Sequence, residues 1–105
     1  MANKVSCIIP AYNESKTIKN VLNVVKNHEL VGEVIVINDG SNDNTKEIVE
    51  KIRGIKLINN DENMGKSASV AKGIKLSKNE IIMLLDADLK NLNKNHVTSL
   101  RLTGI

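Results

Sequence analysis

The sequence predicts a three-layer α/β/α fold with a mostly parallel sheet. Apolar segments that suit strands alternate with segments whose apolar residues recur at helical spacing, through four such pairs. This alternation is typical of parallel sheets with right-handed crossovers and helices on both faces. The chain has 105 residues, of which 41% are hydrophobic and 26% are charged, so we expect one small globular domain over residues 1–105.

The first strand–helix pair is predicted over residues 5–25. Residues 5–10 are an apolar run closed by proline, as a buried strand would be. The helix that follows has one apolar face, formed by Ile18, Val21, Leu22 and Val25. We expect Asn13 or Ser15 to cap this helix, and Cys7, the only cysteine, to be a buried thiol.

The second and third strands are predicted at residues 33–38 and 55–59, which are rich in β-branched residues. Between them, Asn44 and Glu47 have the spacing of a capping box. This spacing predicts that the second helix begins at that point.

The third helix is predicted over residues 66–76, with Gly73 as a weak point in its interior. Its expected inward residues are Val70, Ala71 and Ile74. Residues 80–85 form the fourth predicted strand, which is expected to be buried. A last helix is expected to start near Asn93 or Asn95.

Composition and charge exclude several classes of protein. The net charge is only +3 and Tyr12 is the only aromatic residue, so a nucleic-acid surface built on stacking is not expected. The longest uninterrupted apolar run covers residues 81–85, far fewer than the roughly 20 residues that a membrane span needs. The N-terminus lacks the features of a signal peptide. A cytoplasmic protein is therefore the expectation.

Polar residues are concentrated in the segments that follow the four predicted strands. These segments are residues 11–14, 39–43, 61–66 and 86–88. In a parallel sheet they lie along one edge, and ligands of such folds bind outside the carboxyl ends of the strands. The sequence therefore predicts the functional site at this edge.

Asp86 and Asp88 directly follow the fourth predicted strand. Strand residues i and i+2 point to the same side, so both carboxylates can face one point. A Mg²⁺ or Mn²⁺ ion there would relieve their repulsion. On this pattern alone, a turn cap at Asp88 and a solvated strand end at Asp86 stay open as alternatives.

Gly65 and Lys66 lie between a strand and a helix, as in a phosphate loop. The full phosphate-loop pattern needs a glycine at the position of Asn60, and the intervening Asp61 and Glu62 would repel phosphates. A P-loop-like nucleotide enzyme is therefore a minor alternative. A lysine at a helix N-terminus can still meet an anion, although a solvated lysine is an equal alternative.

Asp39 and Gly40 close the second predicted strand. Asp39 can accept a hydrogen bond from a base or a ribose, and Gly40 permits a tight turn. The sequence Asp-Gly-Ser is also an ordinary turn, which stays open here.

Taken together, the segments VSCIIPAYNES, EVIVINDGSNDNT, ENMGKSASVAKGI and IIMLLDADL resemble the N-terminal half of family 2 glycosyltransferases with the GT-A fold. They are similar to bacterial transferases of the dolichyl-phosphate mannose synthase type. The resemblance covers the chain from Val5 to about Leu100. It implies a Rossmann-like nucleotide-binding half with strand order 3-2-1-4. The implied enzyme transfers a sugar from a UDP- or GDP-sugar, with Mg²⁺ or Mn²⁺ on the diphosphate.

The resemblance also implies roles for individual residues. Those assigned to the nucleotide sugar are Pro10, Ala11, Tyr12, Glu14, Asp39, Gly40, Ser41, Asn63, Gly65, Lys66 and Asp86. Within this set, Tyr12 is expected near the base, Glu14 near the ribose, and Asp39 at the base edge. The D-x-D pair of Asp86 and Asp88 is expected to hold the metal.

Catalytic domains of this family are longer, and their second half supplies the acceptor site and the catalytic base. The resemblance therefore implies a truncated domain that carries the donor half, with no catalytic residue identified in it. The acceptor is expected to be a lipid phosphate or a saccharide, at the inner face of the membrane in a full-length protein. Self-association through an open sheet edge after the fourth strand is also expected. The alternative from another functional class is a non-catalytic module for nucleotide binding or for assembly.

Overall fold

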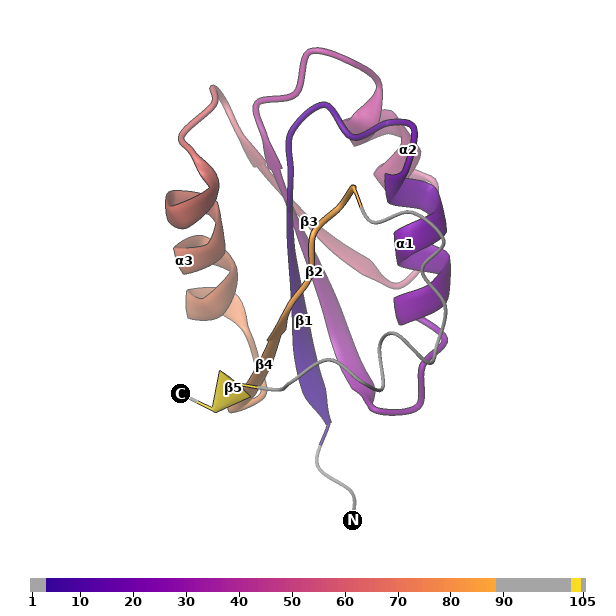
Figure 1. Cartoon of the computed structure of the whole chain (residues 1–105), viewed down its shortest axis with the longest axis vertical. Coiled ribbons are helices and arrows are strands. Elements are labelled where there is room, and N and C mark those ends of the chain that lie inside the picture. Colours follow the sequence, from indigo (N-terminus) through magenta and orange to yellow (C-terminus); the bar gives the residue numbers. More distant parts are fainter. Residues whose placement is uncertain (1–3, 89–102, 105) are drawn as a thin grey trace.

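The computed structural model describes residues 4–88 and 103–104, and these residues form one twisted sheet covered by helices on both faces (Figure 1). The parallel strands are β1 (Val5–Ala11), β2 (Val31–Asp39), β3 (Ile55–Asn60) and β4 (Ile81–Leu84). Their order is β3-β2-β1-β4, followed by the short antiparallel strand β5 (Thr103–Gly104). The predicted α/β class and the order 3-2-1-4 are confirmed.

Each face of the sheet packs against different helices. Helices α1 (Ile18–Val25) and α2 (Thr45–Glu50) cover one face, and α3 (Lys66–Leu76) covers the other (Figure 1). Because side chains alternate along a strand, neighbouring residues enter two separate cores. Cys7 and Ile9 pack on the α1 side, whereas Ile8 packs on the α3 side. The thiol of Cys7 is buried as predicted, and burial raises its pKa to about 12.

The inward face of α3 differs from the prediction. Its buried residues are Ser69 and Gly73, whereas Ala71 is exposed. A Cβ atom at Gly73 would lie 2.5 Å from Ile8 Cγ2 and 2.8 Å from Ile37 Cδ1. Gly73 is therefore the point at which α3 approaches the sheet, and the close contact turns Ala71 toward solvent.

We expect Gly73→Ala to lower the free energy of unfolding by about 1 kcal/mol. Overpacking a filled core costs about 1–3 kcal/mol, whereas the better helix propensity of alanine favours folding by only about 1 kcal/mol. Urea unfolding of the variant measures the difference. Lys75→Ala, at an exposed position of the same helix, is the control and should change stability by less than about 0.5 kcal/mol. A more stable Gly73→Ala variant would contradict the close approach.

The N-cap predicted for α1 is wrong, whereas α2 begins just after Asn44 as predicted but without the capping box. The N-cap of α1 is Thr17, and neither Asn13 nor Ser15 caps it, because a turn in which the carbonyl of Glu14 accepts the N–H of Ile18 precedes the helix. Asn44 is the N-cap residue of α2 but makes no side-chain capping bond, so the capping box does not form. Several polar side chains near a helix start can compete for its free backbone N–H groups.

The carboxylate of Asp43 takes over this capping at α2. Asp43 Oδ1 accepts the N–H of Thr45 at 3.0 Å, just inside the helix. The aspartate one residue before the N-cap therefore satisfies a backbone donor of the first turn.

The fourth strand is shorter and more exposed than predicted. It ends at Leu84, which is 50% exposed, although Leu85 beyond it is buried and donates its N–H to the carbonyl of Ile8. The edge of β4 that was expected to be open is partly covered, because β5 pairs with Ile81 and Ile82. The helix expected near residues 93–95 lies outside the described residues. In the part of the chain that is described, no helix has the length and apolarity to cross a membrane.

Candidate functional site

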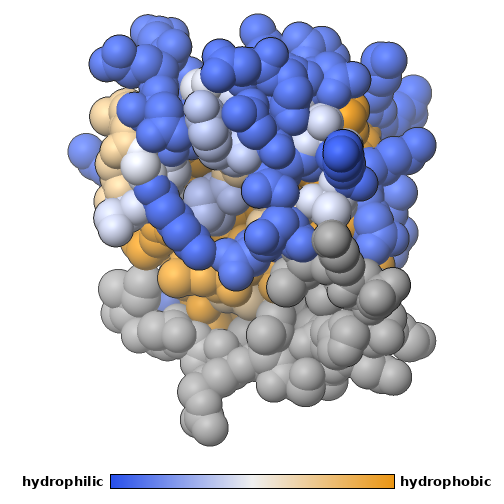
Figure 2. Space-filling view, turned by 45° about the horizontal axis from the view of Figure 1, so that its top comes forward, coloured by the Kyte–Doolittle hydropathy of each residue, from blue (hydrophilic) through white to orange (hydrophobic). Residues whose placement is uncertain are grey.

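A pocket of about 410 Å³ lies at the carboxyl edge of the sheet, within the size range of small-molecule sites. Its lining residues are Pro10, Ala11, Tyr12, Glu14, Asp39, Asn63, Gly65, Lys66, Asp86, Ala87 and Asp88. The edge is at the top of Figure 1, and Figure 2 shows that hydrophilic residues dominate the surface there. All of these residues except Ala87 were singled out from the sequence. Two others that were singled out, Gly40 and Ser41, do not line the pocket.

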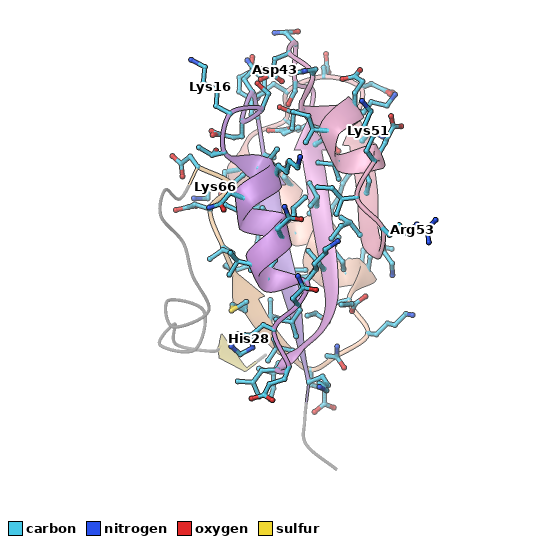
Figure 3. The ribbon with its side chains drawn as sticks, turned by 90° about the vertical axis from the view of Figure 1, so that its right-hand side faces the viewer. Lys16, His28, Asp43, Lys51, Arg53 and Lys66 are labelled. Carbon is cyan, nitrogen blue, oxygen red and sulfur yellow. The ribbon has the colours of Figure 1, made fainter. Side chains whose placement is uncertain are left out.

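Asp86 and Asp88 flank the buried Ala87 on the segment that follows β4. Lys66, the first residue of α3, is labelled in Figure 3. It reaches this segment, because its Nζ lies 2.6 Å from Asp86 Oδ1. Both side chains of this ion pair are largely exposed. The hydrogen bond with Asp86, and then the charges of Asp86 and Asp88, raise the pKa of Lys66. The lysine is therefore a cation held beside one of the two carboxylates.

Glu14 adds a further negative charge to the same pocket. Burial, and then repulsion from Asp88, raise the pKa of Glu14. The loop that carries Glu14 is tied to the segment after β4, because Thr17 Oγ1 donates to the carbonyl oxygen of Ala87 at 2.7 Å. Loops far apart in sequence thus meet around one electronegative region.

The chemistry of this region suits a hard divalent cation. Among the described residues, no group of three or more His, Cys, Asp or Glu side chains forms a complete metal site. The pair of Asp86 and Asp88 nevertheless fits Mg²⁺ or Mn²⁺, since such ions are often held by one or two carboxylates plus water and substrate phosphates. Both carboxylates line the pocket, so a phosphate in it would complete the coordination.

Asp39 is the most buried charged residue of the pocket, at 3% exposure. Its Oδ1 accepts the N–H of Met64 at 2.7 Å and the amide of Asn60 at 2.9 Å, and its Oδ2 accepts the N–H of Gly65 at 3.0 Å. Burial would raise the pKa of Asp39, but these N–H donors outweigh burial and hold the pKa below its ordinary value. Asp39 is thus an anion at neutral pH, with most of its acceptor positions used by the protein itself.

A buried polar network that was not predicted from the sequence supports Asp39. Asn60 is 5% exposed and its amide also lies 3.1 Å from the hydroxyl of the fully buried Ser69. Lys72 donates to Asn60 Oδ1 from the next turn of α3. Asn60 had been considered only as the missing glycine of a phosphate loop. Its place at the carboxyl end of the third strand was the available signal.

Gly40 and Ser41 act on loop shape from outside the pocket. Gly40 has a φ of +72°, and a Cβ there would lie 2.6 Å from the backbone nitrogen of Asn63 and 2.6 Å from the carbonyl carbon of Glu62. Ser41 Oγ accepts the N–H of Asn13 at 2.9 Å, which joins the loops after β1 and β2. These two loops, which carry Lys16 and Asp43, lie at the same end of the molecule (Figure 3).

Comparison with known proteins identifies relatives of this chain. The family described as Glycosyl transferase family 2 matches residues 6–98. A dolichyl-phosphate beta-glucosyltransferase of Trichomonas vaginalis is 44% identical over 94 residues, which cover 77% of this chain and 28% of that protein. The chain spans less than a third of the length of curated relatives such as these.

Solved structures with the same architecture include two bound complexes. Staphylococcus aureus TarS 1–349 in complex with UDP has a TM-score of 0.77 and 30% identity, covering 90% of this chain and 30% of that one. Glucosyl-3-phosphoglycerate synthase of Mycobacterium tuberculosis, in complex with Mn²⁺, UDP and glucosyl-3-phosphoglycerate, has a TM-score of 0.79 and 25% identity. That match covers 91% of this chain and 37% of the synthase.

Proposed function

Since the chain belongs to glycosyl transferase family 2, we propose that its pocket binds the nucleoside diphosphate part of a sugar donor. The sugar is then transferred to an acceptor hydroxyl or phosphate. The observation that carries this proposal is the convergence, in one pocket, of a buried anchored carboxylate, a lysine at a helix N-terminus and two carboxylates after β4. UDP in TarS, and UDP with Mn²⁺ in the mycobacterial synthase, support it.

In this proposal Asp86 and Asp88 would hold a Mg²⁺ or Mn²⁺ ion. Such an ion would act as a Lewis acid and offset the negative charge of the diphosphate. Lys66 lies beside these carboxylates at the first turn of α3, where free backbone N–H groups also favour an anion. These groups together stabilise the diphosphate, the part of the donor that gains charge as the sugar leaves.

The other side of the pocket is assigned to the nucleoside. Tyr12 is 41% exposed at the end of β1, where its ring is accessible to a base. Glu14 follows on the same loop and can accept hydrogen bonds from ribose hydroxyls. Asp39 lines the pocket beneath the β3–α3 loop and has acceptor capacity left for a base N–H.

The proposal assigns donor binding to residues 1–105 and no general base to the described residues, because the carboxylates of the pocket are engaged with nucleotide or metal. The acceptor class follows the names of the relatives, which include a dolichyl-phosphate glucosyltransferase and a poly-beta-1,6-N-acetyl-D-glucosamine synthase. A lipid phosphate or a saccharide is therefore the acceptor to test. A cytoplasmic location, at the inner face of a membrane for a lipid acceptor, stays a prediction.

Titration of the chain with UDP and with GDP, each in Mn²⁺ and in chelator, tests the proposal. We expect one of the two nucleotides to bind at least tenfold more tightly in Mn²⁺ than in chelator, because the cation would offset the repulsion between the carboxylates and the diphosphate. ADP is the control for base recognition. Absence of binding by both nucleotides in Mn²⁺, with the chain folded, would contradict the proposed function.

A further inference from the structure

We propose that Asp39 is a positioning residue: its carboxylate holds the β3–α3 loop (residues 61–65) in the shape that forms one wall of the pocket. This inference rests on the proposed function for the identity of the ligand. The contacts that support it all lie within the protein. It gives Asp39 an indirect role in diphosphate binding, in addition to the contact with the base that is proposed above.

The hydrogen bonds of the carboxylate are the first argument. A carboxylate has about four acceptor positions, and Asp39 gives two on Oδ1 and one on Oδ2 to N–H donors of the protein. Two of these donors are backbone N–H groups of consecutive loop residues, Met64 and Gly65. A residue whose only task is to recognise a base would keep more of its acceptors for the ligand.

The backbone next to Asp39 is the second argument. The carbonyl oxygen of Asp39 lies 3.3 Å from the side-chain amide of Asn63, so the main chain holds the loop as well. The loop backbone at residues 62–63 lies so near Gly40 that a Cβ atom there would be 2.6 Å from it. The loop is thus seated on the Asp39–Gly40 turn along most of its length.

Gly65 and Lys66 connect the loop to the diphosphate side of the pocket. Gly65 has a φ of +97° and is the N-cap residue of α3, where its carbonyl oxygen accepts the N–H of Ser69. Its own N–H is the one bound to Asp39 Oδ2. The next residue is Lys66, which reaches Asp86. Asp39 therefore fixes the residue from which the first turn of α3 and its lysine begin.

Inorganic pyrophosphate with Mn²⁺ tests this inference, because pyrophosphate has no base. We expect Asp39→Asn to bind it at least fivefold more weakly, since the asparagine NH₂ group would face an N–H donor of the loop and release it. The change in charge alone predicts an equal or higher affinity for pyrophosphate, because the variant has lost a negative charge that repels it. Asp61→Asn removes an exposed carboxylate from the same loop and should not weaken binding.

Amide hydrogen exchange supplies a measurement that needs no ligand. In Asp39→Asn we expect the N–H groups of Met64 and Gly65 to exchange at least tenfold faster, with the core strands β1 and β2 unchanged. Unchanged exchange at Met64 and Gly65, or unchanged pyrophosphate affinity in a chain that binds it, would overturn the inference. If the parent chain binds neither pyrophosphate nor UDP nor GDP, the proposed function fails and exchange alone decides the role of Asp39.

A second variant covers the case in which Asp39→Asn does not fold. Asn60→Ala removes one donor to Asp39 without touching the pocket lining. Because the amide of Asn60 helps to orient the Asp39 carboxylate, we expect the same two amides to exchange faster in it, by a smaller factor. Unchanged exchange there would equally overturn the proposal.

Discussion

Asp88→Asn is expected to lower the Mn²⁺-dependent affinity of the chain for its nucleoside diphosphate more than tenfold, about 1.4 kcal/mol. The two carboxylates after β4 line the pocket, and asparagine keeps the shape of Asp88 while removing its charge. When a site has so few protein ligands, its affinity for a hard cation depends strongly on each of them. Asp88 is a better site for this test than Asp86, because Asp86 is paired with Lys66. Replacement of Asp86 would also release Lys66, and the two effects could not be separated.

The measurement is the ratio of affinities in Mn²⁺ and in chelator, for the parent chain and the variant. Asp88 is exposed, so its replacement should leave the melting temperature unchanged and separate binding from folding. Asp61→Asn, an exposed carboxylate outside the pocket, is the matched control for charge. Equal affinity in Mn²⁺ and in chelator for the parent chain would contradict a metal role for this pair.

The alternation of strands and helices could be predicted because it depends on local patterns of apolar residues. The details that failed depend on tertiary contacts. Ala71 was expected to face inward because it is apolar, but the missing Cβ of Gly73 decides how α3 meets the sheet. The caps failed for a similar reason: at α2 the side-chain bond comes from Asp43, outside the helix, to the N–H of Thr45, and Asn44 makes none.

The candidate site was predictable to the extent that residue types at strand ends imply chemistry. The topology of a parallel sheet placed the four loops at one edge, and the pocket gathers residues from each of them. The partners of Asp39 were not predictable, since Met64 and Gly65 contribute backbone N–H groups, which every residue of that loop carries. The buried contact of Asn60 with Ser69 likewise requires the packing of α3 on the end of β3.

Lys66→Gln is expected to change the affinities for two ligands in opposite directions. In the free protein Lys66 Nζ lies 2.6 Å from Asp86 Oδ1, so the lysine competes with any cation for that carboxylate. When a diphosphate is present, the same ammonium group can turn to the phosphate oxygens and leave Asp86 to the metal. The prediction therefore assumes that Lys66 pairs with Asp86 in the free protein and with the diphosphate in the bound state.

For the nucleoside diphosphate with Mn²⁺, the variant should bind about tenfold more weakly, because hydrogen bonds to charged groups contribute about 1.5–3 kcal/mol. For Mn²⁺ alone it should bind up to about fivefold more tightly, within the range of an exposed ion pair. Calorimetric titration with each ligand separates the two effects. Lys75→Gln, at an exposed position further along α3, removes the same charge and should change neither affinity. If the variant lost affinity for both ligands, Lys66 would be acting on the shape of the pocket, and its competition with the cation at Asp86 would be excluded.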